Sequence, residues 1–286
     1  MFGVSGKAEG YTILEVMIFL AVTAGLFVMI AGTFSRRQAT TEFSIAVRDM
    51  ESRLQDIAND VSTGYYSNPG TFRCRIIGAA PDIVAGTNTQ GTNNDCIFVG
   101  RVAQFDLAGS SGKQFNLYSV VGARQASGED VENFDEAQPR ALANPVSPVD
   151  LTEGLSVPVG LVIRSMYAVG TRTNPTLRYP IRAAGFFSSF GAGSSDPTSL
   201  TVNVMPIGGL ASGNPPVSNS KADVVSAVSR VNNARATEYA NPPGGIMVCM
   251  DGDNTNQHVL LKLGGNARQL ATDSTIEEGT CASAGY

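Results

Sequence analysis

The pattern of apolar and polar residues marks out a membrane-length segment near the start of the chain. The twenty positions between Glu15 and Arg36 carry no charge. A helix of this length, at about 1.5 Å per residue, matches the roughly 30 Å hydrocarbon core of a bilayer. A secretory signal peptide has an apolar stretch of only about 7–15 residues, with a small-residue cleavage site behind it. Here Arg36 and Arg37 follow instead, so we expect a retained membrane helix.

A second helical pattern continues directly behind this segment. Apolar residues recur in steps of four and three, which places them in one stripe on a helical face: Phe43, Val47, Met50, Leu54, Ile57 and Val61. Asp49 and Arg53 have the i,i+4 spacing of a supporting ion pair, and Gly64 is typical of a helix C-terminal cap. We predict one helix from about Tyr11 to Thr63, roughly 80 Å long. The stripe spans only three heptads, and strand-like sequence follows it directly. We therefore expect this helix to pack onto a sheet and not to form a lone coiled coil.

From Tyr65 onward, short apolar runs alternate with Gly, Asn, Ser, Thr and Pro, which is typical of β-structure. Two hairpins are predicted, one from 96–107 and 113–124, the other around the loop DGDNTNQ at 251–257. Further segments are expected as strands at 160–170, 176–187 and 199–207, as a short helix at 221–234, and as surface loops at 78–95, 125–157 and 208–220. The predicted fold class is α+β, with a long N-terminal helix packed on a large antiparallel β-rich globular head.

Composition and charge remove several function classes. The net charge is −5, so the chain lacks the basic footprint of a protein whose main partner is nucleic acid. His258 is the only histidine, which excludes multi-histidine metal sites and leaves one imidazole for any Ser–His or Cys–His catalysis. No GxSxG, dinucleotide or phosphate-loop motif occurs. We expect no enzyme and no cofactor, and we expect His258 to be an exposed strand residue.

The four cysteines all follow the predicted membrane helix. Disulfides form and persist where that side of the membrane is oxidising. Three connectivities are open to four cysteines. Pairing of neighbours in sequence gives Cys74–Cys96 and Cys249–Cys281, each closing a loop worth roughly 3–4 kcal/mol by the chain-entropy model. A zinc site is the alternative, but no CxxC spacing supports it.

The loop DGDNTNQ is a weak candidate for a calcium site. Asp251, Asp253 and Thr255 offer oxygens at alternate positions. The loop lacks the Gly at its sixth place and the closing Glu at its twelfth, where Lys262 stands. We expect a solvated hairpin loop without a metal.

The first sixteen residues resemble the class III signal of type IV prepilins and type II secretion pseudopilins. The leader MFGVSGKAEG is short, carries Lys7 and ends in Gly10, and the sequence YTILEV with Glu15 opens the apolar run behind it. Two features depart from the family pattern. Tyr11 stands where these families usually have Phe, and the apolar segment lacks the family's helix-kinking Pro.

The resemblance implies a processing step and an assembly contact. A prepilin peptidase would cut after Gly10 and methylate the new amino group of Tyr11. In a filament, Glu15 of one subunit would pair with the Tyr11 ammonium of a neighbour and so set axial register, because an unpaired buried charge is costly. The alternative is that Glu15 only reaches the lipid headgroups. A disulfide such as Cys249–Cys281 would also tie the C-terminal tail to the last hairpin, as is common in pilins of Gram-negative type.

These expectations divide the chain into four regions: a leader peptide at 1–10, a transmembrane and filament-core helix at 11–35, its amphipathic continuation at 36–64, and a β-rich extracellular head at 65–286. The expected function is that of a structural subunit, minor by its size, of a type IV pilus-like filament. Its partners would be other pilin subunits, prepilin peptidase, the inner-membrane assembly platform and, before assembly, membrane lipid. The protein would be a single-pass inner-membrane protein first and part of an extracellular filament later. A type II secretion pseudopilin, or a membrane-anchored binding protein that never polymerises, remains an alternative.

Overall fold

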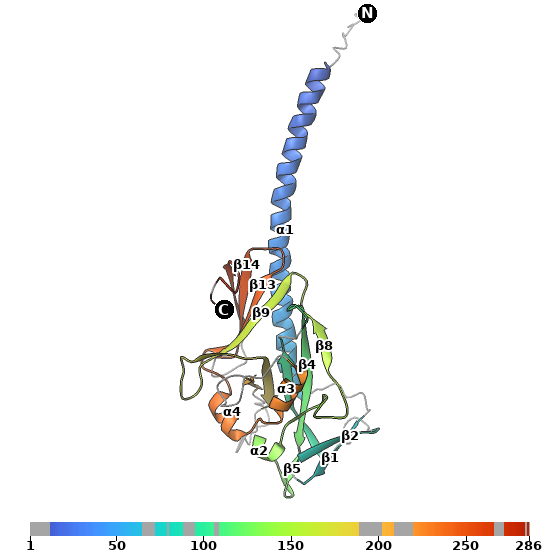
Figure 1. Ribbon diagram of the computed structural model, residues 1–286, viewed down its shortest axis with the longest axis vertical. Coiled ribbons are helices and arrows are strands. Elements are labelled where there is room, and N and C mark those ends of the chain that lie inside the picture. Colours follow the sequence, from blue (N-terminus) through green and yellow to red (C-terminus); the bar gives the residue numbers. More distant parts are fainter. Residues whose placement is uncertain are drawn as a thin grey trace, which may run out of the picture.

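The structure is a computed structural model. Backbone is described for residues 12–64, 72–78, 80–87, 95–105, 109–188, 202–208, 220–265, 272–283 and 285, and side chains are described for the same residues except 31–36. The expected fold class is confirmed: a long helix leads into an antiparallel β-rich head (Figure 1).

Helix α1 (Ile13–Thr63) is 51 residues long and extends far beyond the head (Figure 1). Thr12 begins it, because its side-chain oxygen accepts a hydrogen bond from the Glu15 N–H. Gly64 ends it in the left-handed conformation with φ of 68°, which glycine adopts without the steric cost of a Cβ. The predicted apolar stripe is buried from Phe43 to Val61, so this half packs on the head as expected.

The head contains two main antiparallel sheets. The five-stranded sheet has the order β10 (Arg178–Pro180), β9 (Leu161–Val169), β13 (Gly245–Gly252), β14 (Gln257–Leu263) and β15 (Thr272–Glu278). The six-stranded sheet has the order β12 (Val202–Ile207), β11 (Ala183–Ser188), β3 (Cys96–Gln104), β4 (Gln114–Ala123) and β7 (Arg140–Ala141), with β8 (Glu153–Ser156) also paired to β4. Both predicted hairpins are present, as β3–β4 and β13–β14.

The stripe of α1 shares one hydrophobic core with both sheets. One face of the six-stranded sheet contributes Ala103, Phe115 and Phe186 to this core. The opposite face carries Val102, Tyr118 and Phe187 into a second core. That second core is closed by α3 (Lys221–Val228), with α2 (Phe134–Ala137) and α4 (Asn233–Tyr239) beside it. The six-stranded sheet is therefore covered on both faces, which accounts for its nearly unbroken apolar strands.

Two of the segments expected as loops contain regular structure instead. Residues 78–95 include β2 (Ala80–Ala85), which pairs with β1 (Phe72–Ile77). Residues 125–157 include β5 (Gln125–Ala126), β6 (Glu129–Asp130), α2, β7 and β8. The elements of two to four residues in 125–157 are too short to show a clear period, and burial of residues such as Phe134 and Leu142 orders this segment. The third expected loop, 208–220, lies almost entirely outside the described residues.

Two other predictions were wrong in detail. The single strand expected at 176–187 is split into β10 and β11, which belong to different sheets. Pro180 ends β10 because it has no N–H to continue the ladder. The single helix expected at 221–234 is two helices, since the Asn232 side chain caps α4 as a new start. The polar edge strand β15 was not predicted at all, because it lacks an apolar alternation.

Candidate functional site: the apolar helix and its attachment to the head

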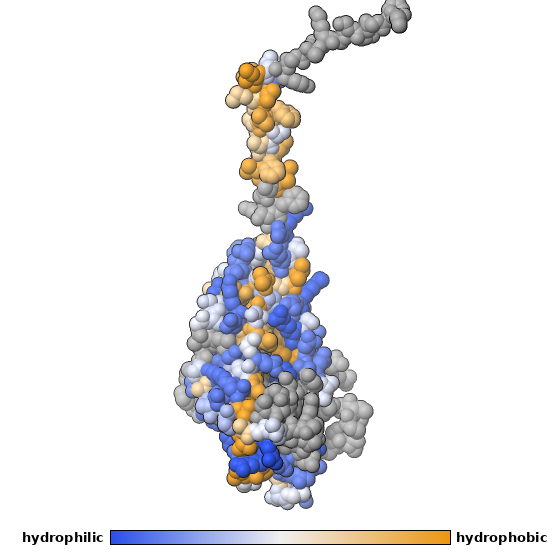
Figure 2. All heavy atoms as spheres, turned by 90° about the vertical axis from the view of Figure 1, so that its right-hand side faces the viewer, coloured by the Kyte–Doolittle hydropathy of each residue, from blue (hydrophilic) through white to orange (hydrophobic). Residues whose placement is uncertain are grey.

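The first eighteen residues of α1 form the most unusual surface of the protein. Ile13–Ile30 is long and apolar enough to cross a membrane, and none of it is buried by the rest of the protein. Figure 2 shows hydrophobic side chains along this part of the rod. Phe19, Phe27 and Met29 are among the large apolar side chains left exposed. Exposed apolar surface on this scale marks a site that contacts lipid or protein.

Glu15 is the one charge within this apolar segment. It lies in the first turn of α1, and its side chain is exposed in the single chain. A carboxylate near a helix N-terminus is favoured by the helix dipole, which accounts for its tolerance at this position. Gly10 and Tyr11, the expected processing residues, lie outside the described residues.

The other half of α1 is attached to the head by polar contacts as well as by its apolar stripe. Arg101 of β3 is almost fully buried, and its guanidinium lies 3.4 Å from the Asp60 carboxylate of α1 and 3.7 Å from that of Glu153. Burial raises the pKa of Asp60; the charge of Arg101 lowers it and that of Asp56 raises it further. Since Arg101 joins α1 to strands β3 and β8, it fixes the rotation of the helix on the sheet.

Two further contacts hold α1 to strands on both of its sides. The Arg53 guanidinium donates to the Ser156 carbonyl of β8 at 2.7 Å and forms an ion pair of 3.0 Å with Asp49. The Gln55 amide donates to the Thr272 hydroxyl of β15 at 2.8 Å. The head half of α1 is therefore held by β8 of one sheet and β15 of the other.

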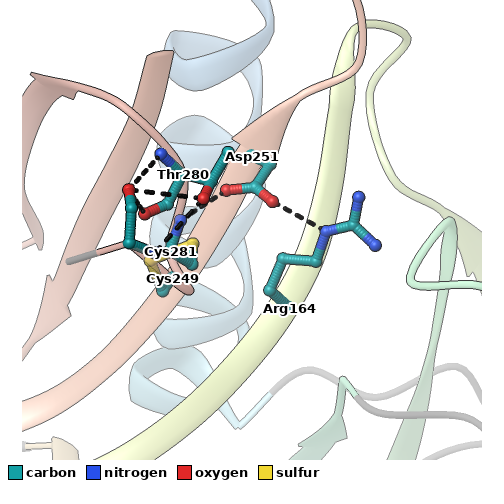
Figure 3. Close-up of polar contacts among 6 residues, drawn as sticks. Arg164, Cys249, Asp251, Thr280 and Cys281 are labelled. Atoms are coloured by element: carbon teal, nitrogen blue, oxygen red, sulfur yellow. Dashed lines mark hydrogen bonds and ion pairs between the residues drawn. A yellow bond between two sulfur atoms is a disulfide. The ribbon is translucent and has the colours of Figure 1, made fainter. Parts of the chain in front are cut away.

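The C-terminal end of the chain is fastened at the last hairpin. Cys281 forms a disulfide with Cys249 of β13, and its N–H donates to Asp251 Oδ1 at 2.7 Å (Figure 3). The other oxygen of Asp251 accepts from Arg164 Nε of β9 at 2.8 Å. Thr280 lies in the same turn, where its N–H donates to Ser283 Oγ at 2.8 Å. One carboxylate thus joins β9, β13 and the C-terminal turn.

The second disulfide, Cys74–Cys96, joins β1 to the start of β3. Both bridges join cysteines that are neighbours in the order of the sequence. The sequence separation is 22 for Cys74–Cys96 and 32 for Cys249–Cys281. They lie in different parts of the head: the first fastens the small β1–β2 hairpin, and the second fastens the C-terminal turn.

The arrangement of Asp251 and Asp253 does not favour a calcium site. Asp251 is engaged as described above, and Asp253 forms an ion pair of 2.8 Å with Lys113. Calcium takes 6–8 oxygen ligands, yet here each carboxylate already faces a cation of the protein. Among the residues described, no group of three or more His, Cys, Asp and Glu side chains is placed to hold a metal ion.

The expectation that His258 is an exposed strand residue was wrong, because only 1% of it is exposed. It lies on β14 directly opposite Asp251 of β13 and Glu277 of β15, and its Nε2 is 3.6 Å from the Glu277 carboxylate. The C-terminal turn is bonded to Asp251 on this side of the sheet, so the outer face of the hairpin is covered. The Cys249–Cys281 disulfide ties this turn to β13, and strand periodicity cannot reveal such a link between distant positions.

Sequence reasoning missed Arg101 and Arg164 as organising residues. The signal for Arg101 was available, since a lone charge in the apolar run CIFVGRVAQ indicates a buried partner. Arg164 stands likewise in the run GLVIRSMYAV, but nothing local pointed to Asp251, 87 positions away. No family model, curated protein or solved structure matches the chain.

Proposed function

We propose that the protein is a structural subunit of a type IV pilus-like filament, made as a prepilin and cleaved after Gly10. The observation that carries the proposal is the division of α1: one half is apolar and uncovered, and the other is fixed to a disulfide-bonded head. The resemblance of the leader, of the YTILEV start and of Glu15 to the class III signal supports it. A large β-rich head suits a minor subunit.

The physical case rests on where the apolar half can be stable. Exposed apolar surface costs about 25 cal/mol per Å² in water, so the segment Ile13–Ile30 needs either lipid or the same helix of other subunits around it. Lipid and neighbouring helices are both apolar. Moving the segment from lipid into the filament therefore changes the free energy of apolar burial only a little. Glu15 then supplies the polar specificity, because pairing it with the Tyr11 ammonium of a neighbour is compatible with only one axial offset.

The proposal implies a defined set of partners and locations. Prepilin peptidase and the inner-membrane assembly platform would act on the chain while it spans the inner membrane once, with the leader in the cytoplasm. Other pilin subunits would then replace lipid in the extracellular filament. No catalytic role is proposed for any residue.

The N-terminus of the mature protein and the effect of Glu15 test the proposal. We expect intact mass measurement to show a chain beginning at methylated Tyr11, and Gly10→Ala to leave the uncleaved precursor in the membrane. Glu15→Ala should still be cleaved but should be depleted at least tenfold from sheared filaments, since an unpaired ammonium would remain in an apolar core.

Glu42→Ala is the matched control, because Glu42 is an exposed carboxylate on the head half of the same helix. Its incorporation should be normal. A mature chain that starts at Met1, or equal incorporation of the Glu15 and Glu42 variants, would contradict the proposal. Absence of the wild-type chain from sheared filaments would favour a membrane-anchored binding protein. Loss of protein secretion on gene deletion, with pilus functions intact, would favour a pseudopilin.

A further inference from the structure

A small cavity is lined by residues of α2, β12 and α4. Helices α2 and α4 lie in the part of the head away from the apolar half of α1 (Figure 1). Its volume is about 250 Å³. Its lining includes Glu132, Phe134, Asn203, Asn233, Ala236 and Thr237. Pockets for drug-sized ligands occupy about 300–1,000 Å³, so this cavity suits a ligand no larger than a single six-membered ring with its substituents.

Two asparagine amides in the lining have their orientation fixed by the protein. The side-chain oxygen of Asn233 accepts the Phe134 N–H at 2.9 Å. The side-chain oxygen of Asn203 accepts from the Asn241 amide at 2.7 Å. These bonds fix which end of each amide is the oxygen and which is the NH₂, so each amide has an NH₂ donor to offer a ligand. Preorganised donors cost a ligand no side-chain ordering when it binds.

Asn241 is itself held rigidly, which strengthens this point. Its backbone N–H donates to the Val204 carbonyl at 2.7 Å, and its side-chain oxygen accepts the Val204 N–H at 2.9 Å. It thus covers the open edge of β12 in the manner of a further strand residue. The Asn203 amide therefore rests on a group that cannot rotate freely.

The charges around the cavity exclude two classes of ligand. Glu132 is one of the lining residues, and Asp135 and Glu136 stand close by: Asp135 accepts from the Asn233 N–H at 3.4 Å, and Glu136 accepts from the Glu132 N–H at 2.9 Å. An anionic ligand would meet this negative field. A calcium ion is disfavoured, because among the described residues no group of three or more His, Cys, Asp and Glu side chains is placed to hold a metal ion.

The groups that remain match a neutral ligand with several hydroxyls. Two NH₂ donors, the Glu132 acceptor and the Thr237 hydroxyl, which donates and accepts, are offered together. Ala236 of α4 and Ala240, the residue that caps the C-terminal end of α4, add an apolar wall for C–H groups. An apolar ligand would leave the two amide donors unpaired, which is unfavourable. We propose that this cavity, termed the amide cavity, binds a single neutral sugar ring.

This binding role goes beyond the filament role and is independent of it, because the amide cavity would serve equally on a polymerised or an unpolymerised head. The full chain in micelles of a detergent without a sugar headgroup is the material for the test. Saturation-transfer NMR with the methyl glycosides of glucose, galactose and mannose should detect binding of at least one, with a Kd in the millimolar range expected for a ligand of this size. Methyl glucuronide, the anionic counterpart, should bind at least tenfold more weakly.

Variants of the lining provide the decisive comparison. The double variant Asn203→Asp, Asn233→Asp keeps the acceptor oxygens that hold Phe134 and Asn241 but removes both donors, so the Kd should rise at least tenfold. Ala236→Leu should weaken binding similarly by filling the cavity, while it retains both donors. Asn254→Asp, the same chemical change in the exposed β13–β14 loop, should leave the Kd unchanged.

Thermal unfolding of each variant provides the folding control. Three results would overturn the proposal: no binding of any of the three hexosides, equal binding by the wild type and a folded double variant, or equal binding of the glucuronide. None of these results bears on filament assembly, so the two proposals fail separately.

Discussion

The two halves of α1 share one uninterrupted backbone but have opposite surroundings. Leu26, in the membrane-length half, is 55% exposed, whereas Leu54, in the head half, is completely buried. The first half is apolar all round, and the second carries its apolar residues in one stripe with polar residues opposite. The head half of this continuous helix has its apolar residues buried against the head of the same chain. The apolar residues of the membrane-length half need lipid or other protein molecules to bury them.

This difference teaches that the stability of the head and its attachment to other molecules are separable. The head half of α1 contributes residues to the main core, so its loss would open both sheets. The membrane-length half contributes nothing to that core. Substitutions in the first half should therefore change assembly without changing the head, and substitutions in the second should do the reverse.

The sharpest way to break this comparison is to truncate one leucine in each half. Leu54→Ala should lower the free energy of unfolding of the head by about 2–5 kcal/mol, because it leaves a cavity in a closed core. Leu26→Ala should change it by less than about 0.5 kcal/mol, since the side chain has no neighbours in the head. Urea unfolding of the full chain in micelles, followed by near-UV circular dichroism of the tyrosines, measures both. Equal losses would contradict the division.

An effect within the same range is expected from the C-terminal bridge. Replacing Cys249 and Cys281 by Ser should cost the head about 3–4 kcal/mol by the chain-entropy model. It should also expose His258, because the C-terminal turn bonded to Asp251, which lies opposite His258 on the neighbouring strand, is released. Diethylpyrocarbonate modification reads this directly, since the chain has one histidine.

The matched control is the double Ser variant of Cys74 and Cys96. Its loss of stability should be similar, because loop-closure entropy depends only weakly on loop length. His258 should remain protected in this variant, since the Cys74–Cys96 bridge fastens a different hairpin. Equal reactivity of His258 in the two variants would show that the C-terminal turn does not cover it.

A third, smaller effect concerns the ion pair that fixes α1 on the sheet. The pKa of Asp60 is raised in the folded protein, chiefly by burial. The folded state therefore holds this proton more tightly than the unfolded state, and the contribution of Asp60 to stability falls as pH rises from about 4 through the folded pKa. The stability of Asp60→Asn relative to wild type should accordingly increase between pH 4 and pH 7. Chemical unfolding at several pH values measures this difference, and a decrease would show that Arg101 outweighs burial.

The smallest effect tests the exposed side of the helix. Asp49→Asn removes the 3.0 Å ion pair between Asp49 and Arg53. The side chains of both residues are more than one-third exposed. The loss should be about 0.2–0.5 kcal/mol, and about 1 M salt should abolish it by screening. A salt-independent loss above 1 kcal/mol, on the scale of about one buried contact, would place this face in the core.

Much of the fold could be predicted from local pattern. The stripe from Phe43 to Val61 predicted the buried face of α1, and Gly64 predicted its end, because helical period and left-handed glycine are local properties. The β3–β4 and β13–β14 hairpins followed from alternation around turn residues. The split between β10 and β11 did not, since the assignment of a strand to a sheet depends on residues far away in the sequence.

The candidate site divides in the same way. The apolar segment and Glu15 were readable from the sequence. The roles of Arg101, Arg164 and Asp251 were not, because each depends on partners between 30 and 87 positions away. The amide cavity was unreadable for a similar reason: Asn203 and Asn233 are ordinary polar residues until Asn241 and Phe134 fix their orientation.

The sequence by itself determined that this protein has a membrane-length apolar helix, an amphipathic continuation and a β-rich head, because periodicity and run length are properties of neighbouring residues. Only the tertiary structure decided which strands share a sheet, why His258 is buried, and how Asp60 and Asp251 join distant segments. Those outcomes depend on contacts between residues far apart in the chain, and such contacts form only when the core that brings them together has been built.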